Sequence, residues 1–562
     1  MDNQRIILFL ALAIVVLFLW NAWEHQHQPP QHLVAGQSVQ PAATSKTKST
    51  QTASTDSSVP TNDIPEVGAK ESVVEPKSVA QEVTKSGQRI HVTTDVLDVD
   101  LDTVGGDIRR ALMLKYPISL SDKEPFPLMI DKMPKLFIAQ SGFLSNTSDV
   151  PNHLSTYKTE KTNYQLSEGK DQLSIPMVWQ SKDGKITVTK TYIFHRGSYL
   201  IDVKQKVTNN SNKEWRARTY KQIQRTEFDA PNKARMVYTF TGAAISTPDT
   251  HYEKIKFKNM ADWKSDKSFS KGGWIAMVQH YFVTAWIPAK NEENHIFSRN
   301  INGTRYVIGM TGNEQVVQAN GSKTFNDKYY AGPKDQDRLK GIAANLDLTV
   351  DYGILTVIAN PLFWLLKWYH GVFGNWGWAI IVLTLTIKLL FFKLSETSYR
   401  SMANMRKISP KFQAIRERYG DDKQRMSQAM MELYKKEKVN PMSGCWPMLV
   451  QIPVFISLYW VLLGSVQIRM APFIFWIHDL STKDPFYVLP VLMGATMFFQ
   501  QKLSANPSLD PMHQKVMQFL PIVFTMFFMM LPAGLVLYYV VNSVLSILQQ
   551  WYITRKIERS SA

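Results

Sequence analysis

Hydrophobic residues are distributed very unevenly along this chain. Ile6–Trp23 is an apolar run, and a second apolar region begins after Ile354, whereas the residues between them are mostly polar. The mean hydropathy of -0.19 averages over these unlike parts and describes none of them. The pattern predicts a membrane protein with a large water-exposed region between two apolar regions.

The first apolar run predicts a membrane anchor at residues 1–23. Ile6–Trp23 would form a helix about 27 Å long, enough to cross the hydrocarbon core of a bilayer. A cleaved signal peptide is the alternative, but its apolar region is usually shorter and ends in small residues, whereas this run ends Trp20-Asn21-Ala22-Trp23. Residues 24–87, rich in Gln, Pro, Ser and Thr, predict a flexible linker.

Residues 88–346 show the period of two that is typical of β-strands. Residues 98–103 alternate Asp with Val, Leu and Thr before Gly105-Gly106, which predicts a strand and a turn. Residues 186–207 predict a hairpin that turns at 195–198. Further strands are expected around positions 237–240, 274–287 and 305–309. So many short strands favour a large β-sandwich.

After Asp347 the composition becomes that of a membrane protein. Residues 347–375 are rich in Trp, Leu and Phe but contain Asn360-Pro361 and Lys367, so we expect a helix lying at the membrane surface. Spans are then expected at 376–392, 446–463, 486–499, 516–530 and 533–549. The third and fourth of these would be only about 21 and 22 Å long, which predicts local thinning of the bilayer unless their flanks extend them. They form a helical core at 376–555, followed by a basic tail at 556–562.

The charges of the connecting segments predict the orientation. Segment 393–444 contains twelve Lys or Arg residues and the tail is basic, whereas Leu531-Pro532 between the last two spans carries no charge. Because short basic segments stay in the cytoplasm, both termini are expected there. Residues 24–353 are then expected in the periplasm, and the chain in the inner membrane of a Gram-negative cell.

A helical hairpin is expected within the basic segment, at 397–438. Met and other apolar residues recur at threes and fours on both sides of Gly420-Asp421-Asp422, which predicts two helices joined there. The apolar stripe is interpreted as the seam of the hairpin, and a docking surface is the alternative. The basic outer faces are expected in water or near anionic lipid or RNA. The candidate charged residues of the hairpin are Arg406, Lys407, Arg416, Arg418, Asp421, Asp422, Lys423 and Arg425.

Lys388 falls inside the first span of the core. A charge at the centre of a membrane helix costs about 2.5–3.5 kcal/mol, so such residues usually face a wet cavity or a partner. The alternative is that this lysine extends its ammonium to the nearby headgroups. Polar residues in the spans could line a pocket open to the cytoplasm, or form ordinary interhelical hydrogen bonds. They are Thr384, Gln451, Tyr538, Tyr539, Asn542 and Ser543.

The sequence contains no phosphate-binding Gly-x-x-x-x-Gly-Lys-Ser/Thr motif and no paired-cysteine or His-Glu-x-x-His metal site. Cys445 is the single cysteine, so no disulfide forms within the chain. The histidines at positions 91, 153, 195, 251, 280 and 295 show no metal-ligand spacing. We therefore expect no enzyme activity, catalytic residue, metal site or cofactor, and no DNA partner.

Stretches along nearly the whole chain resemble the YidC family of bacterial membrane protein insertases. They are TDVLDVDLDTVGGDI (94–108), GGWIAMVQHYFVTAWIP (272–288), LDLTVDYG (346–353), GDDKQRMSQAMMELYKKEKVNPMSGCWPMLVQIPVF (420–455), APFIFWIHDLSTKDPFYVLPVLMG (471–494) and LPAGLVLYY (531–539). Together these stretches are specific for the family, whereas the linker matches only in composition.

The resemblance implies a periplasmic β-super-sandwich on a five-helix insertase core, with a hydrophilic groove open to the cytoplasm and the lipid. It implies that Lys388 is the basic residue of the groove, where related Gram-negative proteins usually carry arginine, and that Thr384 and Tyr539 contact the substrate. Lysine keeps the charge but loses the planar fork that binds a carboxylate in bidentate fashion. The implied partners are nascent membrane proteins, the Sec translocon, and the ribosome or the signal recognition particle receptor.

The expected function is therefore insertion and chaperoning of nascent inner-membrane proteins, alone or with the Sec translocon. Two other functions fit parts of the pattern. A secondary transporter would also place a charge among polar residues within the membrane. A membrane-tethered carbohydrate enzyme would use the β-domain instead, and would need acid and base residues in a cleft.

Overall fold

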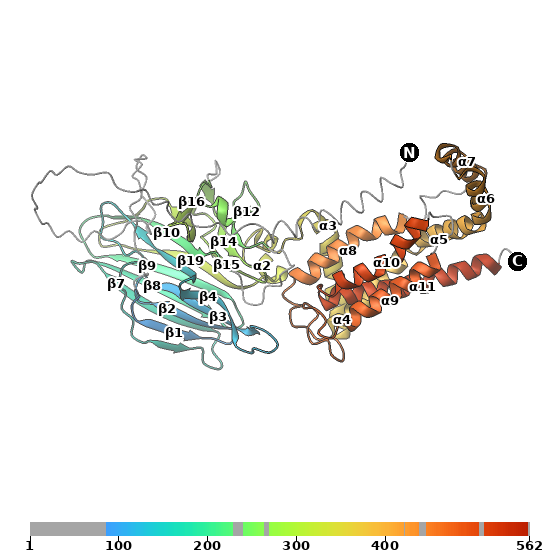
Figure 1. Ribbon diagram of the computed structural model, residues 1–562. Helices are drawn as coiled ribbons and strands as arrows, with labels where there is room; N and C mark the ends of the chain where they lie inside the picture. Colours follow the sequence, from blue (N-terminus) through green and yellow to red (C-terminus); the bar gives the residue numbers. More distant parts are fainter. Residues whose placement is uncertain are drawn as a thin grey trace, which may run out of the picture. The chain divides into compact units, whose positions relative to one another are not determined.

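The computed structural model describes residues 86–228, 240–263, 269–420, 422–437, 446–504 and 511–559. The predicted anchor, nearly all of the predicted linker and most of the strand expected at 237–240 lie outside these residues. The described chain consists of a strand-rich part that ends at Pro333 and a helical part that follows it (Figure 1).

Two β-sheets make up the strand-rich part, which we call the β-domain. Its strands are β1 Arg89–Thr93, β2 Leu97–Asp102, β3 Asp107–Pro117, β4 Pro125–Lys132, β5 Lys135–Leu144, β6 Asn163–Gln165, β7 Gln172–Gln180, β8 Ile186–His195, β9 Leu200–Asn209, β10 Trp215–Thr226, β11 Gly242–Ser246, β12 Glu253–Ile255, β13 Phe269–Lys271, β14 Trp274–Val278, β15 Phe282–Ile287, β16 Glu293–Ile301, β17 Arg305–Gly312, β18 Gln315–Val317 and β19 Ser322–Pro333. Within the described residues, one sheet has 11 strands and the other has 8.

The strand order places distant segments side by side. The larger sheet runs β13-β16-β17-β10-β5-β4-β3-β2-β1-β6, with β18 also paired to β10, and the smaller runs β12-β11-β14-β15-β19-β9-β8-β7. The hairpin predicted at 186–207 is confirmed as β8 and β9. The strand structure expected around 274–287 is confirmed as β14 and β15, which pair with each other and are separated by residues 279–281, where Gln279 N donates to Phe282 O.

Large aromatic side chains and buried polar groups fill the space between the sheets. Trp286 on β15 is fully buried, and its indole N–H donates to Gln222 O on β10 of the other sheet (3.1 Å). Lys221 on β10 likewise pairs with Asp327 on β19. Because unpaired buried polar groups are costly, such cross-sheet bonds fix how the sheets stack. The predicted β-sandwich is confirmed.

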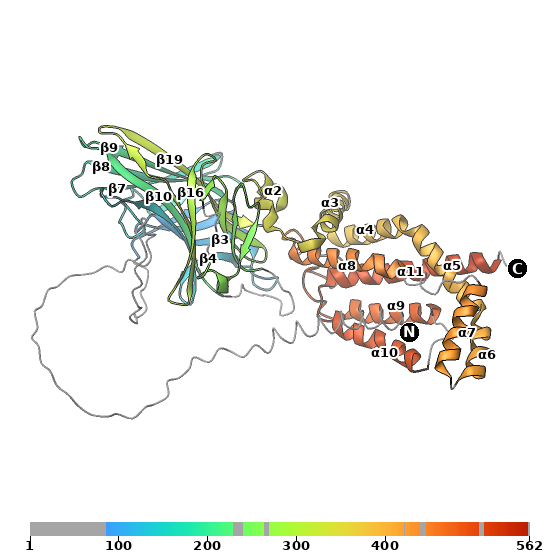
Figure 2. The same cartoon turned by 90° about the horizontal axis from the view of Figure 1, so that it is seen from above.

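The helical part follows a short helix, α2 Gln336–Lys340. Its helices are α3 Thr356–Phe373, α4 Trp376–Leu390, α5 Phe392–Lys407, α6 Ser409–Tyr419, α7 Lys423–Lys436, α8 Trp446–Gly464, α9 Val488–Ser504, α10 Pro511–Phe528 and α11 Ala533–Arg559. Helix α11 packs against α4, α5, α8 and α9, and α9 also packs against α10 (Figure 2). The helix expected at the membrane surface is α3, which continues through Pro361.

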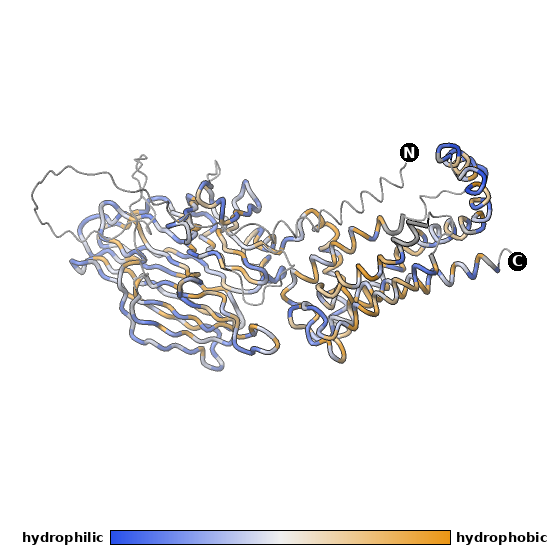
Figure 3. Tube along the Cα trace, in the orientation of Figure 1, coloured by the Kyte–Doolittle hydropathy of each residue, from blue (hydrophilic) through white to orange (hydrophobic). Residues whose placement is uncertain are grey.

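Each predicted span of the core coincides with a helix, although the ends differ. By length and composition, Ala533–Ile557 of α11 can cross a membrane alone, and α4 with α5 passes the same test as a pair bent by 65°. Helices α9 and α10 contain 17 and 18 residues, so they are about 25 and 27 Å long and longer than the predicted segments. Within the helical core, α4 and α8–α10 are predominantly hydrophobic, whereas α6 and α7 are predominantly hydrophilic (Figure 3).

Candidate functional site

Lys388 lies in the last turn of α4. The helix begins after Asn375, whose side-chain oxygen accepts hydrogen bonds from Gly377 N and Trp378 N, and it ends at Leu390. The chain then bends by 65° into α5. The free carbonyl groups at a helix C-terminus favour a nearby cation, which offsets part of the cost of burying the lysine charge.

The side chain of Lys388 points to another helix. Its ammonium donates a hydrogen bond to Ser546 Oγ on α11 (2.7 Å), and the same hydroxyl donates to Asn542 O (2.7 Å). The hydroxyl of Tyr399 on α5 donates to Ser546 O at 3.5 Å. Ser546 therefore links three helices around the lysine. Among the described residues, no carboxylate forms an ion pair with Lys388, although Lys393 and Arg400 nearby both pair with Glu396.

Polar residues line the face of α11 that meets Lys388. Tyr538, Asn542, Ser546 and Gln550 recur every four residues, which places them on one face of the helix, and each is less than 9% exposed. The Gln550 side chain donates to Leu503 O at the end of α9 (3.0 Å). Sequence reasoning missed Ser546 and Gln550, although their four-residue spacing from Asn542 was a usable signal.

The remaining candidate residues differ in how accessible they are. Thr384 is buried at 1% exposure and its hydroxyl donates to Ile380 O within α4 (2.6 Å). Tyr538 is equally buried, and its hydroxyl forms no hydrogen bond of ordinary geometry to a described residue although Gln451 lies beside it. Gln451, Lys388 and Tyr539 are half-buried. Tyr539 packs against Phe528 of α10, with ring centroids 5.0 Å apart.

The hairpin predicted at 397–438 covers α5 from residue 397 onward, together with α6 and α7. Its apolar seam is confirmed, because Met405, Ile408 and Phe412 form a buried cluster against Met430, Leu433 and Tyr434. Lys407, Arg416, Arg418, Asp422 and Arg425 are exposed on the outside. Asp421 and the side chains of Arg406 and Lys423 lie outside the described part of the chain.

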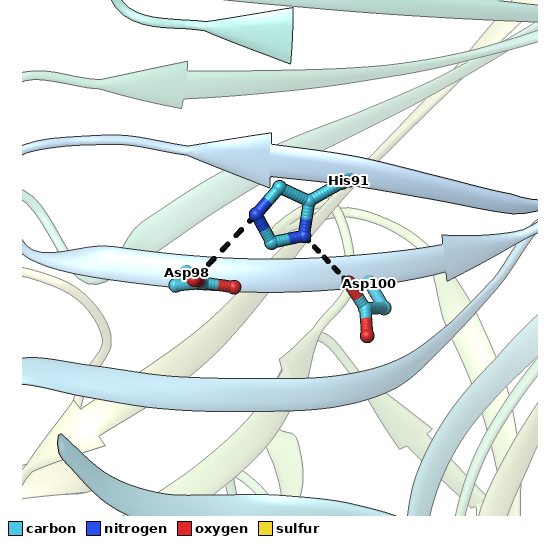
Figure 4. A group of neighbouring side chains, drawn as sticks. All are labelled: His91, Asp98 and Asp100. Atoms are coloured by element: carbon cyan, nitrogen blue, oxygen red, sulfur yellow. Dashed lines mark hydrogen bonds and ion pairs between the residues drawn. The ribbon is translucent and has the colours of Figure 1, made fainter. Parts of the chain in front are cut away.

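A second polar cluster lies in the β-domain, where His91 on β1 is placed between Asp98 and Asp100 on β2 (Figure 4). Its Nδ1 is 2.9 Å from Asp100 and its Nε2 is 3.6 Å from Asp98. Arg110 on β3 donates to Asp100 (2.6 Å) and to Asp98 (2.9 Å). Partial burial disfavours ionisation of Asp100, but the hydrogen bonds from Arg110 and His91 outweigh it and hold the pKa below its usual value.

This cluster has the donor set of a cation site but is better explained as an ion-pair network. A divalent cation would have to compete with the guanidinium of Arg110 for both carboxylates. The grouping arises from strand pairing, since His91 lies directly opposite Asp100. Sequence spacing alone could not reveal it.

Comparisons with known proteins decide between the possible functions. The family model described as the YidC periplasmic domain matches residues 89–365, and the model described as the 60Kd inner membrane protein matches residues 368–560. The membrane protein insertase YidC of Methylococcus capsulatus is 48% identical over the full length of both chains. The insertase of Thioalkalivibrio sulfidiphilus is 46% identical over 100% of this chain and 99% of its own. The chain belongs to the YidC family of membrane protein insertases.

YidC proteins are insertases of the inner membrane, with several spans and a periplasmic domain, and they act on membrane proteins. The expected function, fold class and location are therefore confirmed at this level. The transporter and carbohydrate-enzyme alternatives are set aside. A solved structure of an active YidC insertase, with the first transmembrane domain resolved, matches 83% of this chain at 17% sequence identity and a TM-score of 0.38. A galactose mutarotase-related enzyme matches 43% of this chain at 8% sequence identity and a TM-score of 0.29. The family assignment rests on the sequence relatives.

Proposed function

We propose that this YidC-family chain moves the polar flank of a nascent membrane protein along a hydrophilic groove between α4, α8 and α11, with Lys388 as the attracting charge. The observation that carries the proposal is the state of Lys388. Its ammonium has three N–H groups, and one of them donates a hydrogen bond to Ser546. No carboxylate among the described residues forms an ion pair with it. An acidic residue of a substrate is the partner that this charge lacks.

The free energy for insertion comes from the substrate. Each Leu, Ile, Phe or Val gains about 0.3–0.6 kcal/mol at the centre of a membrane helix, so a segment of about 20 apolar residues gains several kcal/mol. The opposing barrier is the polar flank, where each Asp, Lys or Arg costs about 2.5–3.5 kcal/mol in the bilayer centre. A hydrophilic groove shortens the path of that flank through hydrocarbon, so no nucleotide is required.

Half-buried polar groups support the same path. Gln451 on α8 and Tyr539 on α11 have accessible surface, and they could contact a substrate as the chain stands. Thr384, Tyr538 and Asn542 are covered, so a contact with them requires α4 and α11 to separate locally. We propose that the substrate first meets Lys388, Gln451 and Tyr539.

The hairpin α6–α7 is proposed as the docking element on the cytoplasmic side. Its exposed basic residues suit the ribosome, the signal recognition particle receptor or anionic lipid headgroups, and the apolar seam leaves them on the outer faces. Co-sedimentation with ribosomes at increasing salt tests this. Replacing Arg416 and Arg418 with Glu should weaken binding at low salt, whereas Gln413→Ala, also exposed, should not.

We propose that the chain works alone and also beside the Sec translocon. Liposomes containing only this protein should insert a substrate with a short, weakly charged flank. A substrate with a long charged periplasmic domain should need the translocon in the same liposomes, since each further charge adds to the barrier. Equal insertion of both substrates without the translocon would contradict this division.

Complementation tests the role of the charge. In a strain depleted of its native insertase, Lys388→Arg should restore growth and Lys388→Ala should not. Lys393→Ala is the matched control, because Lys393 is five residues away and its side chain is 94% exposed. Immunoblots of the membrane fraction separate loss of function from loss of protein. Full rescue by Lys388→Ala at normal protein levels would make the charge dispensable.

A further inference from the structure

The segment between α8 and α9, residues 465–487, forms an ordered loop that exposes large apolar side chains. We call it the α8–α9 loop. Phe475 is 81% exposed and Phe486 is 69% exposed, and Ile474 and Tyr487 are each more than a third exposed. Single exposed apolar residues are common, but four within one short loop indicate a surface that contacts something apolar.

The backbone of the loop is strained at three of its large residues. Met470, Phe475 and Tyr487 have positive φ angles of 57°, 52° and 56°. Residues with a side chain rarely adopt this conformation, and it persists only where the surrounding structure enforces it. Phe475 is therefore held in its exposed position by the architecture of the loop.

Two buried carboxylates provide that architecture. Asp479 accepts hydrogen bonds from Met470 N (3.0 Å) and Ser481 N (2.8 Å). Asp484 accepts from the Trp476 indole (3.0 Å) and from Leu489 N at the start of α9 (2.8 Å). Both side chains are turned inward, with exposures of 8% and 1%.

The loop is bonded to the ends of the other core helices. Asn375, which caps α4, donates to Pro472 O and Phe473 O (3.2 and 3.3 Å). At the start of α11, Ala533 N donates to Thr482 O (2.7 Å) and Gly534 N to Leu480 O (2.9 Å). The loop thus lies at the end of the helical core where α4, α9 and α11 begin and where α8 and α10 end.

This end of the core faces the periplasm, because the basic segments lie at the opposite helix ends. The exposed apolar surface continues from the loop onto the adjoining turns of the spans. Trp378 at the start of α4, Val491 on α9 and Met530 after α10 are 46%, 56% and 61% exposed. Phe473 of the loop packs edge-on against Trp378, with centroids 5.7 Å apart.

We propose that the α8–α9 loop anchors the core in the periplasmic leaflet, with Phe475, Ile474 and Phe486 inserted at the level of the phospholipid headgroups. The chemistry fits this partner. Aromatic side chains favour the membrane interface, and both carboxylates of the loop are hidden. The exposed charged residue Lys483, whose ammonium lies 5.9 Å from the centre of the Tyr487 ring, can meet a lipid phosphate.

Such an anchor would set the depth of the core in the bilayer. The loop joins the ends of several helices, so fixing the loop fixes where their first turns lie. This inference does not depend on the role of Lys388, and it requires only the orientation of the spans.

Spin labelling in liposomes of phosphatidylethanolamine and phosphatidylglycerol tests the proposal. Cys445→Ser removes the single cysteine, and a nitroxide is then attached to Phe475→Cys. Phe519→Cys on α10, at a position 64% exposed, is the lipid reference, and Lys182→Cys on the exposed β7–β8 turn is the water reference. Collision of the label with oxygen, which concentrates in lipid, is compared with collision with a water-soluble nickel chelate.

The anchored loop gives an oxygen-to-nickel collision ratio at position 475 that is above the ratio at 182 and below the ratio at 519. Phe486→Cys is a second labelled variant and should behave in the same way. A ratio at 475 equal to that at 182 means that the loop stands in water and overturns the proposal. Protection from both reagents means that a protein surface covers the loop, which also overturns it.

Discussion

The ammonium of Lys388 and the hydroxyl of Ser546 are joined by a 2.7 Å hydrogen bond between residues that are 158 positions apart in sequence. This bond fixes the lysine against α11. A lysine extended to the headgroups, the alternative left open by the sequence, would point away from the neighbouring helices. The ammonium is thus held against α11, and we propose that it acts on a substrate there.

The bond predicts a measurable coupling between the two side chains. In a double-mutant cycle of Lys388→Met and Ser546→Ala, the coupling in the free energy of unfolding should be about 1 kcal/mol, as for other polar pairs between membrane helices. Ser543→Ala in place of Ser546→Ala is the control, since Ser543 is buried on the same helix but does not bond Lys388. Equal coupling in both cycles would argue against the bond.

Replacement by alanine should have opposite effects on stability at two glycines, one packed between α9 and α10 and one facing open space on α3. A Cβ at Gly494 would lie 2.2 Å from Thr525 Oγ1, whose hydroxyl donates to Pro521 O, so Gly494→Ala should destabilise the chain by about 1–3 kcal/mol. Gly371 on α3 faces open space, and Gly371→Ala should stabilise by about 0.5–1 kcal/mol through helix propensity. Thermal unfolding in detergent measures both, and a stabilising Gly494→Ala would contradict the packing.

The packing of the hairpin seam predicts that replacing Phe412 destabilises the hairpin locally. Phe412 is 3% exposed, and its ring lies 5.1 Å from that of Tyr434. Phe412→Ala removes a buried aromatic side chain, a change that costs about 3–5 kcal/mol in compact cores. Hydrogen exchange should rise across α6 and α7 but not in α11. Gln413→Ala, at an exposed position, should leave the exchange unchanged.

Asp107 predicts how the stability of the β-domain depends on pH. Burial raises the pKa of this carboxyl to about 6, against the attraction of Arg109 and Lys190. The folded state then binds the proton more tightly than the unfolded chain, whose aspartates titrate near pH 4. Stability should fall as the pH rises from about 4 to 6, by an amount on the order of 3 kcal/mol.

Asp107→Asn should remove this dependence, because the amide does not titrate. Chemical unfolding of the β-domain within the full chain, followed at several pH values, provides the measurement. Asp183→Asn is the control, since a hydrogen bond from Ser181 lowers the pKa of this exposed carboxyl and its titration lies below that range. An unchanged pH profile for Asp107→Asn would mean that another group is responsible.

The sequence predicted the parts of the structure that depend on local periodicity. The seam through Met405, Ile408 and Phe412 follows from side chains three and four positions apart, which meet on one helix face. The β8–β9 hairpin follows from alternation around a short turn. The predicted spans lie on α4 and α8–α11 for the same reason, because long apolar runs are unambiguous.

Contacts between distant segments could not be predicted in this way. The lysine partner of Ser546 lies 158 residues earlier, and the paired residues of β5 and β10 lie 74–88 positions apart. The end of α4 at Leu390 was placed too late, since the bend into α5 has no glycine or proline to announce it. The start of α9 was placed too early, because Asp484 accepts from Leu489 N and Val488 begins the helix.

Cross-linking to a stalled nascent membrane protein tests the proposed groove most directly. A photoreactive residue replaces Tyr539, which is half-buried beside the polar face of α11, or Val544, which is 40% exposed on another face of that helix. We predict adducts with the nascent chain from position 539, reduced in the Lys388→Ala background, and far fewer from position 544. No adduct from position 539, or equal yields from both positions, would contradict the account.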